Sequence, residues 1–228
     1  IKQLKEPASM ADDEIRTQIV LMMSARAGSA AALHTNAKVA AEAAPVATIV
    51  LEIDPTEPMP TPELALAVEQ IQALGIATLI FGDAALARVV KADGLHVPAS
   101  KSIAADYREA RDILGTRFIV GVDVGRTRHD AMTLGEEGAD YIAFGIPPHV
   151  EDRATARARR LELISWWSEI FEIPCVAFDV ETPDEAQALA AAGADFIAVR
   201  VPAELPESGV AAFIMSFAAA VSSPALAS

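Results

Sequence analysis

One pattern decides the fold: EEGADYIAFGIP at Glu136–Pro147 returns as AAGADFIAVRVP at Ala191–Pro202. A looser third copy, KADGLHVP, stands at Lys91–Pro98. Gly138 and Gly193 are typical of the left-handed residue that ends a helix, and the apolar run after each is typical of a buried strand. The repeat therefore predicts a unit, used several times, in which a helix ends and a buried strand begins.

Eight apolar runs rich in β-branched residues recur along the chain, and we interpret each as a strand. Most of these runs are continuous rather than alternating, which is typical of parallel strands covered on both faces. The predicted strands are Ile19–Ser24, Ala47–Ile53, Ala77–Phe81, Gly94–Val97, Phe118–Val122, Tyr141–Phe144, Cys175–Phe178 and Phe196–Val199.

The stretches between these runs have helical spacing and recognisable ends. Thr61–Leu74 and Thr182–Ala192 open with Thr-Pro and stop just before a glycine, and Ser102–Leu114 also stops before a glycine. Repeated strand–helix alternation predicts an α/β fold, a (β/α)8 barrel of eight parallel strands with surrounding helices. An open doubly wound sheet would usually carry a glycine-rich turn after its first strand. Ser24–Gly28 reads SARAG instead, which favours the barrel.

Length, charge and hydropathy narrow the functional classes. The net charge of the 228 residues is −14, which argues against a nucleic-acid partner because phosphate contacts need a basic surface. No apolar stretch reaches the roughly 18 residues that cross a bilayer, so we expect no membrane partner and a cytoplasmic protein. The one cysteine, Cys175, lies in an apolar run, and we expect it in the core.

We expect a single domain over residues 10–228. Residues 1–9 (IKQLKEPAS) precede Met10, and we interpret them as an added or disordered leader outside the fold. One helix carries Trp166, Trp167 and Phe171 close together, and its apolar side could belong to the core or to a subunit interface. A homodimer is therefore one expectation.

In a barrel of this kind, the chemistry is carried by residues at the carboxyl ends of the strands. The predicted strand ends are rich in ionisable groups: Arg26, Glu52, Asp54, Asp83, His96, Lys101, Asp123, Arg126, Arg128, His129, His149, Arg153, Asp179, Glu181 and Arg200. Three further aspartates precede strands, and we interpret them as turn residues at the opposite end: Asp93, Asp140 and Asp195. One basic cluster has the spacing of a solvated helix face, with a ligand role as the alternative: Arg153, Arg157, Arg159 and Arg160.

Taken in order, the strand motifs resemble those of thiamine phosphate synthase and its sister group, the thiazole tautomerases. The resemblance covers the third to the eighth strand. Its motifs are LIFGD (Leu79–Asp83), DGLHVPAS (Asp93–Ser100), GVDV (Gly121–Val124), GADYIAFG (Gly138–Gly145), IPCVAFD (Ile173–Asp179) and AAGADFIAV (Ala191–Val199). The chain is thereby identified as a divergent member of this family.

The resemblance implies an enzyme that joins hydroxymethylpyrimidine diphosphate to a thiazole phosphate, with Mg²⁺ holding the diphosphate. It makes Asp83 a metal ligand and a catalytic residue. Lys101 falls where the family has its second metal-binding aspartate, which puts Mg²⁺ binding in question. Asp123 replaces a serine of the family and is a catalytic candidate. Arg153 falls where the family has a lysine that contacts the diphosphate.

The largest departure from the family follows the seventh strand. There the family binds the thiazole phosphate through a Gly-Gly pair, and this chain has Asp179-Val180. An ionised carboxylate repels a phosphate, by about 4 kcal/mol at roughly 4 Å with an effective dielectric constant near 20. Arg200 at the end of the eighth strand could compensate, and we expect an Asp179–Arg200 pair. The residues expected to bind substrate are Arg200, Asp179, Lys101, His149 and Arg126.

Three functional hypotheses follow from these observations. The first is the coupling activity of the family. The second is a reaction on another phosphorylated small molecule held by arginines of the rim, because guanidinium groups suit phosphate. The third is a binding protein that has lost the metal and phosphate motifs.

Overall fold

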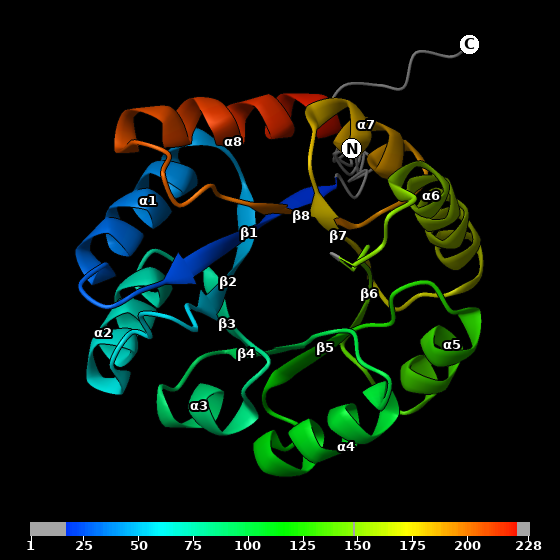
Figure 1. Ribbon diagram of the computed structural model, residues 1–228, viewed down its shortest axis with the longest axis horizontal. Helices are drawn as coiled ribbons and strands as arrows, with labels where there is room; N and C mark the ends of the chain where they lie inside the picture. The colour runs from blue at the N-terminus through cyan, green and yellow to red at the C-terminus, as the bar shows by residue number, and fades with distance from the viewer. Residues whose placement is uncertain (1–16, 148, 223–228) are drawn as a thin grey trace, which may run out of the picture.

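The computed structural model of the chain describes residues 17–147 and 149–222, so the predicted leader at residues 1–9 lies outside the described residues. Within these ranges eight parallel strands form a closed barrel in sequence order, and the last strand pairs with the first. A helix follows each strand and packs on the outside of the barrel (Figure 1). The predicted (β/α)8 barrel is confirmed.

The strands are β1 (Gln18–Ala25), β2 (Val46–Ile53), β3 (Ala77–Phe81), β4 (Gly94–Val97), β5 (Ile119–Asp123), β6 (Tyr141–Phe144), β7 (Cys175–Val180) and β8 (Phe196–Arg200). The helices are α1 (Ala30–Ala43), α2 (Thr61–Gln72), α3 (Ala84–Val89), α4 (Ile103–Leu114), α5 (Arg128–Glu136), α6 (Arg153–Ile170), α7 (Pro183–Ala191) and α8 (Glu207–Ser222). No helix in these ranges is long and apolar enough to cross a membrane.

Strands and helices begin and end close to the predicted residues because local chemistry sets their ends. β3, β4 and β6 match the prediction residue for residue, and β7 continues two residues further, to Val180. Thr182 caps α7 as its Thr-Pro signal predicts, since its side-chain oxygen accepts the N–H of Glu185 at 3.2 Å.

The three aspartates of the repeat hold neighbouring strands together at the amino-terminal end of the barrel. Asp93, before β4, accepts the backbone N–H of Thr78 in β3 at 2.7 Å. Asp140 and Asp195, before β6 and β8, make the same bond to the strand before their own, at 2.7 and 2.8 Å. These aspartates lie at the end of the barrel opposite the rim, as predicted, and they link strands as well as forming turns.

Two apolar layers make the core, one between strands and helices and a smaller one inside the barrel. Cys175 is fully buried, as predicted. His96 points into the barrel interior, where its ring stacks on Phe178 with centroids 4.0 Å apart and its Nδ1 lies 2.9 Å from the hydroxyl of Tyr141. Burial lowers the pKa of His96 to about 3, so the ring is neutral at physiological pH. His96 is therefore a packing residue of the barrel interior.

Candidate active site

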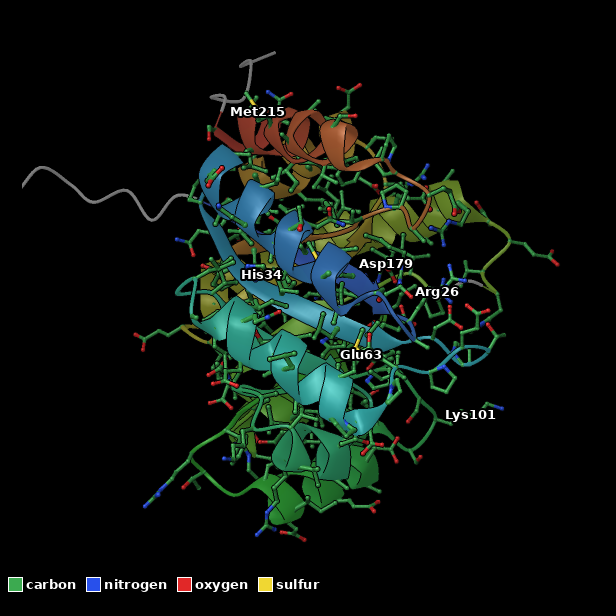
Figure 2. The ribbon with its side chains drawn as sticks, turned by 90° about the vertical axis from the view of Figure 1, so that its left-hand side faces the viewer. Arg26, His34, Glu63, Lys101, Asp179 and Met215 are labelled. Carbon is green, nitrogen blue, oxygen red and sulfur yellow. The ribbon has the colours of Figure 1, made fainter. Side chains whose placement is uncertain are left out.

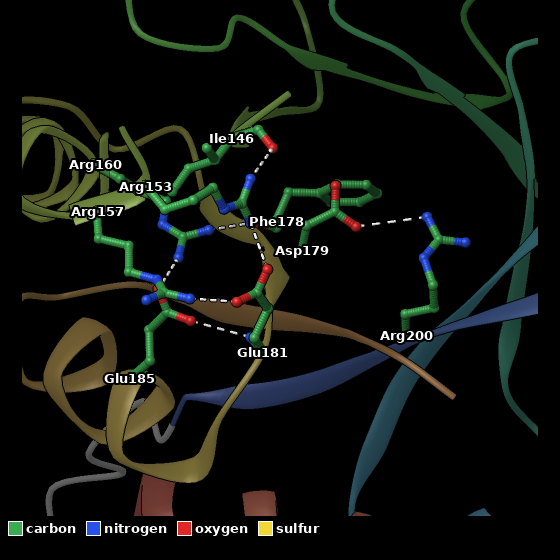
Figure 3. A network of polar contacts seen from close by, with 9 residues as sticks. All are labelled: Ile146, Arg153, Arg157, Arg160, Phe178, Asp179, Glu181, Glu185 and Arg200. Atoms are coloured by element: carbon green, nitrogen blue, oxygen red, sulfur yellow. Dashed lines mark hydrogen bonds and ion pairs between the residues drawn. The ribbon is translucent and has the colours of Figure 1, made fainter. Parts of the chain in front are cut away.

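Two strand-end carboxylates flank Arg200 at the mouth of the barrel. Arg200 Nη2 lies 3.5 Å from Asp179 Oδ1, and Nη1 forms an ion pair with Glu52 (Figure 3 shows the Asp179 contact). The expected Asp179–Arg200 pair is therefore present, with Glu52 as a second partner of the arginine. One cation shared by two carboxylates leaves this cluster with a net charge of −1.

Asp179 occupies an unusual backbone position. Its φ is +54°, and the pairing of β7 with β8 shifts register between Ala177 and Val180. Such a bulge turns a side chain toward a new direction. A left-handed conformation costs a non-glycine residue about 1 kcal/mol or more. Burial raises the pKa of Asp179, against the opposing effect of Arg200. At Asp179, the left-handed backbone and the burial of the carboxylate both cost free energy, and the side chain still lies at the mouth of the barrel.

Asp123 lies at the end of β5 and is only 7% exposed. Its Oδ1 accepts the backbone N–H groups of Gly125 at 2.7 Å and Gly145 at 3.0 Å. Burial raises its pKa to about 6 in spite of these two bonds, and the charge of Asp179 raises it further. Asp123 therefore changes its protonation state near pH 6, within the range in which a group can act in acid–base or electrostatic catalysis.

Arginines of α6 meet acidic residues of the β7–α7 connection and of the first turn of α7 (Figure 3). Arg153 and Arg157 each form an ion pair with one oxygen of the Glu181 carboxylate. Arg157 Nε also lies 3.1 Å from Glu185 Oε1. Arg153 Nη1 donates to the carbonyl of Ile146 at 3.2 Å. Arg153 and Arg157 are thus turned toward the rim of the barrel.

The expected solvated face of α6 is wrong for Arg160, the one buried arginine among the four of the cluster. Arg160 is 1% exposed, and its guanidinium binds Glu185 and the carbonyl of Phe178. Burial lowers its pKa, opposed by Glu185, but a guanidinium keeps its charge. Arg157 and Arg159 follow the prediction, because their side chains are 43% and 39% exposed. Arg159 pairs with Glu162 on the same helix at 3.1 Å. The sequence pattern fails for Arg160 because its partners come from the next strand and helix, β7 and α7.

A cavity of about 530 Å³ opens among these groups. Arg153 and Glu181 line one part of it, and Asp179 and Arg200 line another. Apolar walls come from Ile146, Val180, Pro202 and Phe213. This volume suits a small organic molecule, and the charged side chains suit one that carries an anionic group.

The remaining predicted residues lie away from this cavity. Asp83 is the N-cap of α3, where its Oδ1 accepts the N–H of Leu86 at 2.8 Å, and it lines a separate depression near α4. Lys101 lies at the outer edge of the same end of the barrel as Asp179 (Figure 2). Arg126 and His149 are exposed in loops. The structure brings together Arg153, Asp179 and Arg200, and it does not bring Asp83 or Lys101 to them.

The donor set around Asp83 does not form a metal site by itself. One carboxylate oxygen of Asp83 accepts the N–H of Leu86 at the start of α3. Lys101, which was expected at the place of the family's second metal-binding aspartate, carries a positive charge. Over residues 17–147 and 149–222, no three His, Cys, Asp or Glu side chains converge as metal ligands. Mg²⁺ binding stays a prediction that rests on Asp83 alone.

Sequence reasoning missed the acidic partners of the arginines. Glu52 and Glu181 were recognisable only as strand-end residues. For Glu185, one feature of the sequence indicated a structural role. It stands three residues after the cap Thr182, the spacing at which a glutamate reaches back to a helix start. Its Oε2 accepts the backbone N–H of Glu181 at 3.0 Å. Nothing in the sequence indicated that it also binds Arg157 and Arg160.

The chain is similar to known proteins over most of its length. The sequence model of a family described as thiamine monophosphate synthase matches residues 20–201. The thiamine-phosphate synthase of Hyphomonas neptunium is 34% identical over 208 residues, which cover 89% of this chain and 92% of that protein. The thiamine-phosphate synthase of Erythrobacter litoralis is 43% identical over 143 residues, 60% of this chain. That match spans 66% of the Erythrobacter litoralis protein, and the match to the Rhodospirillum centenum protein of the same name spans 61%.

Solved structures show the same fold at low identity. Thiamine phosphate pyrophosphorylase from Pyrococcus furiosus has a TM-score of 0.66 at 19% identity, covering 90% of this chain and 95% of that one. Tryptophan synthase from Mycobacterium tuberculosis has a TM-score of 0.67 at 16% identity, covering 91% and 93%. Because these two similar structures belong to proteins with different names, the likeness shows a shared fold and does not identify a reaction.

Proposed function

Because the chain belongs to the thiamine monophosphate synthase family, we propose that it joins hydroxymethylpyrimidine diphosphate to a thiazole phosphate and releases diphosphate. The match to residues 20–201 confirms the family predicted from the strand motifs and extends it to β1 and β2. The observation that carries the proposal is the cavity at the barrel mouth, where Arg153 and Arg200 face the space that a substrate would enter.

The reaction needs electrostatic stabilisation at two positions, one that gains negative charge and one that gains positive charge. The bond from the pyrimidine methylene carbon to the diphosphate oxygen breaks, and its electron pair leaves with the diphosphate. The thiazole nitrogen supplies the pair for the new carbon–nitrogen bond, so the product carries a thiazolium cation. Negative charge therefore grows on the leaving group while positive charge grows on the organic part.

The residues of the cavity are divided in the same way. Arg153, with Arg157 beside it, would bind the diphosphate and stabilise the charge that it gains, since planar guanidinium groups bind phosphate oxygens well. Asp179 lines the cavity and would lie toward the carbon and nitrogen that become positive. Asp123 is 7% exposed and is not among the residues that line the cavity, so it would act on them through its charge. Because Mg²⁺ binding stays a prediction that rests on Asp83 alone, no step of this proposal is assigned to a metal.

One observation favours a different acceptor substrate for the pyrimidine group, a thiazole alcohol in place of the thiazole phosphate. Glu52 and Asp179 already neutralise Arg200 and leave the cluster with a net negative charge. At roughly 4 Å, one carboxylate opposes a phosphate by about 4 kcal/mol at an effective dielectric constant near 20. A thiazole alcohol without a phosphate would avoid this repulsion. The alternative function is therefore the same coupling with an uncharged acceptor.

A coupling assay tests both forms of the proposal. The purified protein is given hydroxymethylpyrimidine diphosphate with either thiazole phosphate or the thiazole alcohol, with and without Mg²⁺, and diphosphate release is measured. Arg153→Met is expected to lower the rate by about 100-fold, the cost of losing one group that stabilises transition-state charge. Arg159→Met is the matched control, because it removes an arginine of the same helix that pairs only with Glu162 among the described contacts. No diphosphate release with either acceptor would refute the proposal.

A further inference from the structure

The Glu181 carboxylate occupies the two arginines that are best placed for an anion. One oxygen pairs with Arg153 and the other with Arg157. A carboxylate that bridges two guanidinium groups in this way resembles two oxygens of a phosphate in charge and spacing. Glu181 and Arg153 both line the cavity at the barrel mouth. The site is thus filled by a group of the chain itself.

The backbone of Glu181 is fixed by its surroundings, whereas its side chain is held by two ion pairs that are partly exposed to water. Its N–H donates to Glu185 Oε2 at 3.0 Å, and the next residue, Thr182, caps α7. The side chain is 48% exposed, so its carboxylate can leave the arginines by side-chain rotation alone. The ion pairs that it would give up are partly exposed to water, and such pairs contribute little to stability.

The arginines would keep their positions after Glu181 left. Arg153 still donates to the carbonyl of Ile146 at 3.2 Å, and Arg157 Nε remains 3.1 Å from Glu185 Oε1. Each guanidinium has further N–H donors beyond these bonds. An entering anion would therefore find two oriented donors without any movement of α6.

We propose that Glu181 is an internal counter-ion that the diphosphate end of the substrate displaces from Arg153 and Arg157. Glu181 cancels one of the positive charges of the empty site, weakens its affinity for anions, and makes room by turning toward solvent when a diphosphate binds. This inference rests on the proposed function for the identity of the anion. It adds that Glu181 determines how tightly the anion is held.

The test is calorimetric titration of the protein with inorganic pyrophosphate at low and at physiological ionic strength. Glu181→Gln keeps the shape of the side chain and removes the competing charge, and we expect a Kd about 3- to 10-fold lower than in the parent protein. Glu162→Gln is the matched control: it removes the same charge from a pair with Arg159 on α6, outside the cavity. The control is expected to change the Kd by less than twofold. Arg157→Met is expected to weaken binding and to remove the gain from Glu181→Gln.

Two results would overturn the inference. One is a Kd for Glu181→Gln equal to that of Glu162→Gln, or higher than in the parent, which would mean that Glu181 orients the arginines for the anion. The other is no pyrophosphate binding by the parent or by Glu181→Gln. Circular dichroism checks the fold, and Glu181→Ser repeats the test with a side chain that cannot reach the arginines. The coupling assay reports separately on the proposed function, because pyrophosphate binding needs no turnover.

Discussion

Asp123→Asn should change how the stability of the protein depends on pH. The buried carboxylate has its pKa raised from 3.8 to about 6, mainly by burial. Because the pKa is higher in the native state, the unfolded chain loses this proton first as the pH rises. The stability contributed by Asp123 is therefore present in full below about pH 4 and declines as the pH rises, until the native carboxylate is also ionised above about pH 6.

The shift sets the size of the effect. Each pH unit between the two pKa values costs about 1.4 kcal/mol, so the full loss is about 3 kcal/mol. Between pH 5 and pH 8 the loss is about 1.4 kcal/mol, because at pH 5 part of it has already occurred. Asparagine can still accept the N–H groups of Gly125 and Gly145 through its oxygen, and it has no charge to bury.

Urea unfolding followed by circular dichroism at pH 5, 6, 7 and 8 measures this difference. The parent protein should lose about 1.4 kcal/mol more than Asp123→Asn between pH 5 and pH 8. Asp112→Asn, at an exposed position of α4, is the control and should follow the parent. Equal pH dependence in the parent and in Asp123→Asn would refute the reasoning. If Asp123 also acts in catalysis, the same variant gains stability at pH 8 and loses coupling activity.

Three further substitutions test the packing and charge of the site. Gly145→Ala would place a methyl group 2.3 Å from Asp123 Oδ2 and should cost about 2 kcal/mol in urea unfolding. The cost should largely vanish in an Asp123→Ala background, and an equal cost in both backgrounds would contradict the contact. Arg160→Met leaves Glu185 without its buried partner and should cost about 3 kcal/mol, whereas a loss below about 1 kcal/mol in thermal unfolding would contradict the buried pair. Asp179→Gly removes a carboxylate and a left-handed non-glycine residue from the cavity. It should tighten binding of inorganic phosphate by about tenfold in calorimetry, and an unchanged Kd would show that Asp179 does not oppose anions.

The family and the fold were predictable because their signals are local. Continuous apolar runs, Thr-Pro caps and the Gly-Ala-Asp repeat each act within a few residues, and together they predicted the strand order and most strand ends. The position of a site at the carboxyl ends of the strands then follows from the parallel barrel. The Asp179–Arg200 pair was within reach of sequence reasoning for the same reason, since β7 and β8 are neighbours.

What the sequence alone determined is therefore the barrel, its core and the end at which chemistry takes place. Only the tertiary structure decided which charged groups of the rim meet. Arg200 and Glu52 are 148 residues apart, and Arg153 and Glu181 are 28 apart, so no local pattern relates them. The bulge that turns Asp179 into the mouth arises from pairing between two strands. Arg160 is buried where it binds the carbonyl of Phe178 in β7 and the carboxylate of Glu185 in α7. Side-chain direction and burial depend on such distant neighbours, and they determine which arginines of the rim are open to a substrate and which the chain already holds.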